Sequence, residues 1–335
     1  MTKIKIGLIG LGRIGMMHLK NLLNLSDLYE VVAISDPFKT DLKDIAENHH
    51  IVKYSKDYQD VLEDSNVEAV LIASSTDTHA EIIIAAAEAG KNILCEKPID
   101  TDIERIKRII AVVKENHVQL QIGFNRRFDH NFNRIHQLVT KGIIGQPQII
   151  KISSRDPAPP SIDYIKVSGG IFSDMMIHDL DMIRYLSNTE ISEVYAQGSV
   201  LVDPEIGKAG DIDTAMVSCK FANDALGVID NSRQAVYGYD QRAEVFGSKG
   251  QAFSTNDKLT NVQVDLAQGS RLDKIPNFFI ERYTQAYLDE LRSFHDSVIN
   301  KTEPIATGID GLRSIQLAQA CLKSFKEHRP VEVEY

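Results

Sequence analysis

The sequence predicts an α/β protein in two parts, a doubly wound parallel sheet followed by an α+β region with an open, mainly antiparallel sheet. Up to about residue 124, apolar runs with strand composition alternate with amphipathic helical patterns, which is typical of parallel strands joined by helices. Beyond that point, strand-like runs are joined by short turns, as at 223–224 and 247–250, which indicates antiparallel hairpins. We expect domains at 1–124 and 125–335, with the C-terminal segment able to pack back on the first.

The first domain opens with a strand, a glycine turn and a helix. Residues 4–9 form a short apolar run, the turn GLGRIG occupies 10–15, and residues 16–25 carry a helical apolar pattern. A second apolar run at 31–34 leads to Asp36, 21 residues beyond the last glycine of the turn. Strand, spaced glycines, helix and acidic residue together form the fingerprint of a dinucleotide-binding Rossmann domain.

Each residue type in this fingerprint has a physical task. Gly10 permits the tight turn, Gly12 leaves room for a pyrophosphate, and Gly15 lets the helix pack close to the strand. Asp36 would accept the ribose hydroxyls and repel a 2′-phosphate, which favours NAD over NADP. A loop or cap carboxylate is the plainer interpretation of Asp36. The cofactor contacts expected in this stretch are Gly10, Gly12, Arg13, Ile14, Gly15 and Asp36.

The rest of the first domain continues the alternation of strands and helices. We expect helices at 39–49, 54–62, 79–89 and 102–115, and strands at 69–73, 92–95 and 119–124. Ligands bind beyond the carboxyl ends of the strands in such a sheet, so the loop after 69–73 should lie beside the cofactor. The contacts predicted there are Ser74, Ser75, Thr76 and His79. A helix cap made by Thr76 or Thr78 is the plainer alternative, and one residue can do both.

The strand at 92–95 runs directly into Glu96-Lys97-Pro98. Pro98 forbids helix and restricts the residue before it, so Lys97 is expected to be a pinned cation above the nicotinamide. Glu96 is expected to border the cofactor as well. The alternative for Lys97 is a surface lysine in an ordinary turn.

A second informative stretch lies at 169–181. If the chain is helical from about Ser173, then Asp174, His178 and Asp181 stand on one face. A carboxylate one turn from an imidazole can fix the tautomer of that ring and raise its basicity, which is a general-base arrangement. A surface ion pair and a metal site are the alternatives. No third ligand has recognisable spacing, so we expect no metal.

The other patterns beyond residue 124 predict an open sheet with one face on its own helices and the other available to another subunit. The expected helices are 131–141, 279–300 and 308–327, and the expected strands are 148–153, 192–202, 214–221, 227–235, 242–246, 261–266 and 331–333.

Three of these motifs carry a resemblance to a known family. The GLGRIG turn, Glu96-Lys97-Pro98 and the Gly169-Gly170 run that reaches Asp174 and His178-Asp179 resemble the glucose-fructose oxidoreductase and inositol dehydrogenase family over nearly the whole chain. Within that family, the RDPAPP segment and the residues that follow it up to Gly170 are similar to bacterial inositol 2-dehydrogenases.

The resemblance implies a set of active-site roles. Lys97 would hydrogen-bond the reacting oxygen from a turn whose bond to Pro98 is often cis. Asp174 and His178 would be the acid and the histidine of the active site. The residues implied to hold substrate hydroxyls are Arg127, Asp156 and Tyr237, together with Lys97, Asp174 and His178, and Tyr283 is a further candidate.

The function that the resemblance implies is NAD-dependent oxidation of a cyclic polyol. Myo-inositol would become 2-keto-myo-inositol (scyllo-inosose), with scyllo-inositol or an aldose as alternative substrates. The substrate would give a hydride to NAD and its hydroxyl proton to His178, while Lys97 stabilises developing alkoxide charge. A non-enzymatic NAD(H) redox sensor is the alternative from another class, because a fold alone does not establish chemistry.

Composition excludes several other classes of protein. The net charge of −10 argues against nucleic acid or an anionic membrane as the main partner. The longest apolar stretch is too short to span a membrane, and the N-terminus has no signal-peptide pattern. Cys95, Cys219 and Cys321 lack disulfide or metal spacing, so we expect reduced, buried thiols. These features suit a cytoplasmic enzyme, and the resemblance implies a homotetramer.

Overall fold

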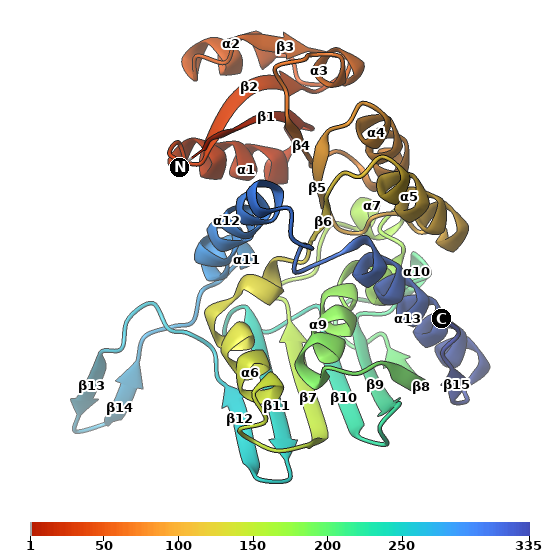
Figure 1. The fold of residues 1–335 in the computed structure, drawn as a ribbon. Helices are drawn as coiled ribbons and strands as arrows, with labels where there is room; N and C mark the ends of the chain where they lie inside the picture. The colour runs from red at the N-terminus through yellow and green to blue at the C-terminus, as the bar shows by residue number, and fades with distance from the viewer. Residues whose placement is uncertain (1) are drawn as a thin grey trace. The chain divides into compact units, whose positions relative to one another are not determined.

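The computed structural model describes residues 2–335 and divides the chain into two compact units (Figure 1). The first unit contains the residues up to Phe128 together with Gln285–Arg313. The second contains Asp129–Thr284 and Ser314–Tyr335. The chain therefore leaves the first unit after Phe128, returns to it at Gln285–Arg313, and ends in the second unit.

The first unit is built on a six-stranded parallel sheet in the order β3-β2-β1-β4-β5-β6. The strands are β1 Ile4–Ile9, β2 Tyr29–Ser35, β3 Lys53–Ser55, β4 Ala69–Ile72, β5 Asn92–Glu96 and β6 Leu120–Gly123. This confirms the predicted Rossmann sheet. The strand order reverses between β1 and β4, and an open parallel sheet binds its ligand at such a switch point.

Helices of the first unit pack on this sheet through apolar faces. They are α1 Arg13–Asn24, α2 Leu42–Asn48, α3 Gln59–Leu62, α4 Thr76–Glu88 and α5 Ile103–Glu115. The β4 strand is buried along its whole length, as its unbroken apolar sequence predicts. Helix α12 (Thr284–Asn300) supplies Leu291 and Phe294 to the same core cluster as β1 and β2. The Tyr29 hydroxyl donates to the Leu291 carbonyl over 2.6 Å, so the returning segment completes this core.

Two expected helices differ in the structure. The segment 54–62 was predicted as one helix, but its start belongs to the edge strand β3 and only α3 is helical. Pairing with β2 satisfies the backbone of β3, and this tertiary hydrogen bonding overrides the local helical pattern. The segment 279–300 is also split, into α11 (Phe279–Arg282) and α12, with Tyr283 at the C-cap of α11.

The second unit is built on a seven-stranded sheet in the order β12-β11-β7-β10-β9-β8-β15. Its strands are β7 Pro147–Arg155, β8 Ile191–Ser199, β9 Thr214–Phe221, β10 Leu226–Ser232, β11 Asp240–Gly247, β12 Gly250–Ser254 and β15 Val331–Glu332. All neighbours are antiparallel except β7 and β10, so the sheet is mixed and mainly antiparallel, as predicted. Both expected hairpin turns are present, between β9 and β10 and between β11 and β12.

One face of this sheet is covered by helices and the other is open. Strand β9 alternates buried and exposed side chains along its length, the pattern of a sheet with one wet face. The helices of the unit are α6 His130–Thr140, α7 Ile162–Ile165, α8 Gly170–Asp174, α9 Ile177–Ser187, α10 Pro204–Lys208 and α11, with α13 Gly308–Glu327 near the C-terminus. The sequence did not predict the short helices α7 and α10. A separate two-stranded hairpin, β13 (Gln263–Leu266) with β14 (Gly269–Leu272), extends from the unit (Figure 1).

Cys95, Cys219 and Cys321 are buried free thiols, as expected. Across residues 2–335, no helix combines the length and the apolar character that a membrane span needs.

Candidate functional site

The glycine turn after β1 is shaped by contacts that only glycine allows. Gly10 has a φ of +90°, and a Cβ there would lie 2.5 Å from the Ser74 amide nitrogen. A Cβ on Gly15 would lie 1.9 Å from the Gly10 carbonyl oxygen. A Cβ on Gly12 would meet nothing within 4 Å. The turn and the loop after β4 are therefore pressed together, while the side of the turn at Gly12 is open to a ligand.

The Asp36 carboxylate ties the end of β2 to this turn. Its Oδ2 accepts from the Leu11 backbone N–H at 2.7 Å, and its Oδ1 accepts from Phe38 and Lys39 N–H at 2.8 and 3.0 Å. Asp36 therefore acts as a loop carboxylate that accepts backbone hydrogen bonds, which was the plainer interpretation of this residue. A carboxylate has about four acceptor positions, so these bonds leave capacity for a ribose hydroxyl.

The loop after β4 meets the start of α4 at the same edge of the sheet. Ser75 is the N-cap residue of α4 by backbone position, so the alternative interpretation, a cap made by Thr76 or Thr78, is wrong. The Thr78 hydroxyl instead donates to the Ser75 carbonyl at 2.8 Å and lies 2.7 Å from the Ser74 hydroxyl. This side-chain bonding gives the Ser74 loop a fixed shape beside the glycine turn.

The turn after β5 holds Lys97. The Lys97–Pro98 peptide bond is cis, as the family resemblance implied. The Glu96 carboxylate accepts from His18 Nε2 at 2.7 Å through one oxygen and from the Lys97 backbone N–H at 3.3 Å through the other. The backbone that carries the Lys97 amine is therefore attached to helix α1 through Glu96.

A second carboxyl group, that of Glu290, is buried near Glu96. The side chain of Glu290 is fully buried, and neither of its oxygens has a hydrogen-bond partner among the described residues. Burial, and then the charge of Glu96, raise the pKa of Glu290 well above its usual value. Glu290 is therefore a neutral acid under conditions in which an exposed glutamate is ionised.

Asp174 and His178 lie in the second unit, but not on one continuous helix as expected. Asp174 ends α8 and His178 stands in the first turn of α9. Between them, the Met176 N–H bonds the Ile171 carbonyl five residues back at 2.8 Å, which breaks the regular helical ladder. The local backbone, rather than a four-residue helical spacing, thus sets how these two side chains lie.

Two residues that sequence reasoning missed hold the Asp174 carboxylate. The Tyr164 hydroxyl donates to Oδ1 at 2.8 Å, and Arg233 Nη1 donates to Oδ2 at 3.4 Å. Arg233 is 1% exposed and also bonds Asp211 at 3.3 Å. Arg233 is 59 residues from Asp174, and no spacing in the sequence signals a contact at that separation.

The candidate substrate residues of the second unit lie at the end of β7 and before β11. Asp156 directly follows β7, and its backbone bonds Ser232 and Ala235. The Tyr237 hydroxyl donates to Asp240 at 2.6 Å and accepts from Arg155 at 3.2 Å. Burial and Asp240 raise the pKa of Tyr237, so its hydroxyl stays protonated.

The neighbouring tyrosines differ from Tyr237 in exposure. Tyr237 is 52% exposed, whereas Tyr239 and Tyr283 are buried and meet edge to face with ring centres 5.9 Å apart. Of the three, Tyr237 is the one whose side chain solvent reaches most, and the aromatic pair belongs to the core of the second unit.

Arg127 lies in the 3₁₀ turn 125–128 and is buried in the first unit. Its Nη1 donates to the Ile305 carbonyl at 2.6 Å, and its Nη2 lies 2.8 Å from the Asp310 carboxylate. These contacts attach the turn to the returning segment. Contact of Arg127 with substrate stays a prediction.

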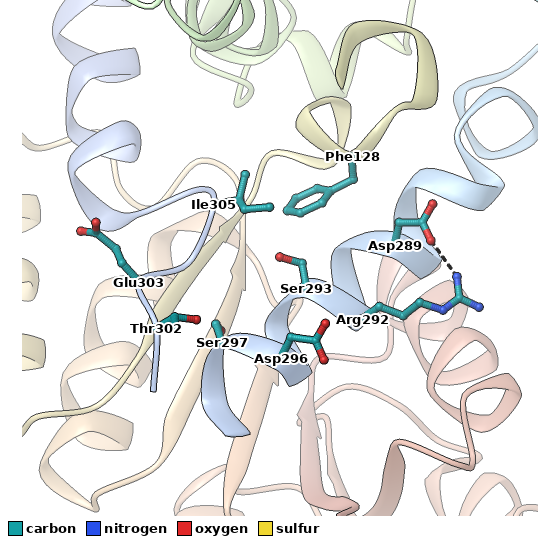
Figure 2. A pocket seen from close by; sticks show the side chains of 9 residues that line it. All are labelled: Phe128, Asp289, Arg292, Ser293, Asp296, Ser297, Thr302, Glu303 and Ile305. Atoms are coloured by element: carbon teal, nitrogen blue, oxygen red, sulfur yellow. Dashed lines mark hydrogen bonds and ion pairs between the residues drawn. The ribbon is translucent and has the colours of Figure 1, made fainter. Parts of the chain in front are cut away.

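Two further features do not coincide with the predicted site residues. The side chains of Asp129, His130 and Asp257 approach within metal-binding distance of one another, but the Arg282 guanidinium bonds both Asp129 and Asp257 and supplies the balancing positive charge. A cavity of about 420 Å³ in the first unit lies along α12 and the segment after it (Figure 2). Its described lining residues are Phe128, Asp289, Arg292, Ser293, Asp296, Ser297, Thr302, Glu303 and Ile305, none of which was predicted.

The sheet with its switch point, the constrained glycine turn and the Asp36 carboxylate define the first unit as a dinucleotide-binding domain of the Rossmann type. Residues 4–124 match the family model described as "Oxidoreductase family, NAD-binding Rossmann fold", and residues 132–253 match the "GFO/IDH/MocA C-terminal domain". The chain belongs to the GFO/IDH/MocA oxidoreductase family.

Individual relatives match over the whole chain. The myo-inositol 2-dehydrogenase of Thermotoga maritima is 50% identical, with 99% of each chain covered. The NAD(+) scyllo-inositol 2-dehydrogenase of Bacillus subtilis is 38% identical over 99% of this chain and 97% of its own. The crystal structure of Lactobacillus casei scyllo-inositol dehydrogenase, with bound NAD(H) and scyllo-inositol, matches with a TM-score of 0.92 at 31% identity and 99% coverage of both chains.

The glycine contacts predict two substitutions with different effects. Gly15→Ala should lower the free energy of unfolding by about 1–3 kcal/mol and weaken NAD binding, because its methyl group would overlap the Gly10 carbonyl. Gly12→Ala has space for its methyl group, so it should lose little stability. The methyl group would occupy the space expected for the pyrophosphate, so the substitution should weaken NAD binding. Thermal unfolding and NAD titration measure both. Equal destabilisation by the two substitutions would contradict the assignment.

The raised pKa of Glu290 predicts a pH-dependent cost to stability. Above the ordinary glutamate pKa, the unfolded chain releases a proton that the folded chain retains at Glu290, so folding becomes less favourable as pH rises toward the folded-state value. Glu290→Gln replaces the titrating carboxyl group with an amide and so removes this pH dependence. The stability of the variant relative to the parent should therefore increase as the pH is raised from 5 to 8, by up to about 1.4 kcal/mol per pH unit while the folded parent keeps the Glu290 proton. Denaturant unfolding at both pH values tests it, and a pH-independent difference would count against a neutral Glu290.

Proposed function

We propose that this protein catalyses the NAD-dependent oxidation of a cyclic polyol, with myo-inositol converted to 2-keto-myo-inositol. The observation that carries the proposal is that the chain aligns end to end with a myo-inositol 2-dehydrogenase and contains Lys97, Asp174 and His178 in the family's motifs. The structure supports it with a restrained Lys97 turn in the first unit and a supported Asp174 carboxylate in the second.

The chemistry needs a base, a cation and a hydride acceptor. Bound NAD supplies the acceptor: the substrate C–H bond breaks and its electron pair leaves with the hydrogen to the nicotinamide ring. His178 takes the hydroxyl proton as the carbonyl bond forms. Lys97 stabilises negative charge on the same oxygen. Asp174, whose own position is set by Tyr164 and Arg233, stabilises the imidazolium that results.

The remaining proposed contacts divide between cofactor and substrate. Asp36 takes the adenosine ribose, and Gly12 faces the pyrophosphate. Arg127, Asp156 and Tyr237 hold ring hydroxyls, supported by the Tyr237–Asp240–Arg155 hydrogen bonds. Neutral and charged donors and acceptors of this kind suit a polyol. The other proposed cofactor contacts are Gly10, Arg13, Ile14, Gly15, Ser74, Ser75, Thr76, His79, Glu96 and Lys97.

The proposal includes a cytoplasmic homotetramer. The open face of the seven-stranded sheet carries partly exposed apolar side chains at Ile149, Met216, Leu226, Phe246 and Phe253. A second copy that covers this face would remove them from water. Mass measurement in solution tests this, and a monomer would contradict it.

Scyllo-inositol is the second candidate substrate, because a relative that aligns nearly end to end is named for it. Reduction of NAD and, separately, of NADP should be followed with myo-inositol, scyllo-inositol, chiro-inositol and glucose. Activity on myo-inositol with NAD supports the whole proposal, and a preference for scyllo-inositol changes only the substrate. Binding of NAD without turnover of any polyol would favour the redox sensor.

Loss of the proposed base gives a direct prediction. His178→Ala should lower kcat by about 100- to 10,000-fold, because proton removal then falls to water. His136→Ala is a matched control in the same unit, since His136 bonds the Tyr185 carbonyl on α9 and has no proposed role in the reaction. Steady-state rates of both variants are compared with the parent. Near-normal turnover by His178→Ala would rule out this base.

A further inference from the structure

Two buried histidines lie on either side of the Lys97 turn, and nothing in the proposed chemistry uses them as acids or bases. His18 is on α1 and His79 is on α4, and each is 1% exposed. Both belong to the first unit, and both bond residues adjacent to Lys97. A buried polar ring costs free energy unless it is hydrogen-bonded, so these contacts have structural consequences.

His79 bridges two loops at the carboxyl edge of the sheet. Its Nδ1 lies 2.8 Å from the Pro98 carbonyl oxygen, in the turn after β5. Its Nε2 lies 3.2 Å from the Ser74 carbonyl oxygen, in the loop after β4. One ring therefore connects the turn that carries Lys97 to the loop proposed to contact the cofactor.

The His79 ring can donate to only one of these two carbonyl oxygens at a time when it is neutral. Burial lowers the pKa of His79, against the opposing effects of the two carbonyls, Glu96 and Asp100. A neutral imidazole has one N–H, and two carbonyl oxygens face the ring. The Nδ1–H tautomer donates to the Pro98 carbonyl, and the Nε2–H tautomer donates to the Ser74 carbonyl. The shorter distance to Pro98 favours the first tautomer, so the bond to Pro98 is the principal one and the bond to Ser74 forms only in the minor tautomer.

His18 acts on the other neighbour of Lys97. A carboxylate only accepts, so His18 Nε2 donates to Glu96 Oε1 at 2.7 Å, and Glu96 Oε2 accepts from Lys97 N–H. A Cβ on Gly123 would lie 3.0 Å from Glu96 Oε2, so glycine at this position leaves the carboxylate its space. Glu96 is thus held by α1, by its own turn and by the close approach of β6.

We propose that His18 and His79 are positioning residues for Lys97, His18 through the Glu96 carboxylate and His79 through the Pro98 carbonyl. His79 also couples the Lys97 turn to the cofactor loop at Ser74. The proposal rests on the role given to Lys97 above. A displacement of about 1 Å at a reacting group can cost about 100-fold in rate. We therefore expect the buried hydrogen bonds to Glu96 and Pro98, the two neighbours of Lys97, to affect turnover.

Amide side chains can separate the two ring nitrogens. The amide nitrogen of asparagine approximates the position of Nδ1, and that of glutamine approximates Nε2. His79→Asn should keep the Pro98 bond and lose the Ser74 contact, whereas His79→Gln should do the reverse. At His18 the pattern inverts: His18→Gln should keep the Glu96 bond and His18→Asn should lose it.

The measurements are kcat at saturating substrates, the Kd of NAD, and the acylation rate of Lys97 by an amine-reactive reagent, read by mass spectrometry. We expect His79→Gln and His18→Asn to lower kcat by about 10- to 100-fold and to change Lys97 acylation. We expect His18→Gln, which keeps the bond to Glu96, to stay within about threefold of the parent in kcat. His79→Asn should raise the Kd of NAD.

A matched control separates positioning from packing. His295 is another buried histidine of the first unit, whose Nε2 lies 2.9 Å from the Thr2 carbonyl. His295→Asn should lower the unfolding temperature without changing kcat or Lys97 acylation. If Asn and Gln are equally damaging at each histidine, and their effects track unfolding temperature, the two rings are core packing and the proposal is wrong. If the parent oxidises no polyol, the proposed function is wrong. Lys97 acylation and NAD affinity would still test whether His18 and His79 position Lys97.

Discussion

The structure of the first unit depends on the close approach of three backbone segments at the switch point of its sheet. Gly15 on α1 approaches the Gly10 carbonyl, and Gly10 in turn approaches the Ser74 amide, each at a distance that a single Cβ would forbid. This contact aims the N-terminus of α1 at the space beside Gly12 and holds the loop after β4 next to it. The Asp36 carboxylate then fixes the same turn to β2 through the Leu11 amide.

Buried polar groups extend this arrangement to the neighbouring strand. His18 on α1 bonds Glu96, and His79 on α4 bonds Pro98, so the helices that border the cofactor region also restrain the Lys97 turn. Glu290 is buried in the same unit and is kept neutral by its surroundings.

Much of the candidate site could be predicted because its motifs are local in sequence. The glycine turn, the distance to Asp36 and the Glu96-Lys97-Pro98 motif each lie within a few tens of residues, and their chemistry can be inferred from residue type. The contacts of Asp174 were not predictable. Tyr164 and Arg233 reach it only because a broken helix and a distant strand end meet, and the expected continuous helix from Ser173 was wrong for the same reason. The edge strand β3 was missed because its partner β2, rather than its own pattern, makes it extended.

The sequence by itself determined the alternation of strands and helices in the first unit apart from the edge strand β3, the class of cofactor and the family of the protein. These follow from short-range spacing and from apolar periodicity, which are properties of the chain before it folds. Only the tertiary structure decided that the returning C-terminal residues are Gln285–Arg313, which residues contact Asp174, and that His79 lies between two loops. The first two join groups far apart in the chain, and the third depends on which acceptors surround a buried ring. Such contacts form only once the core has excluded water.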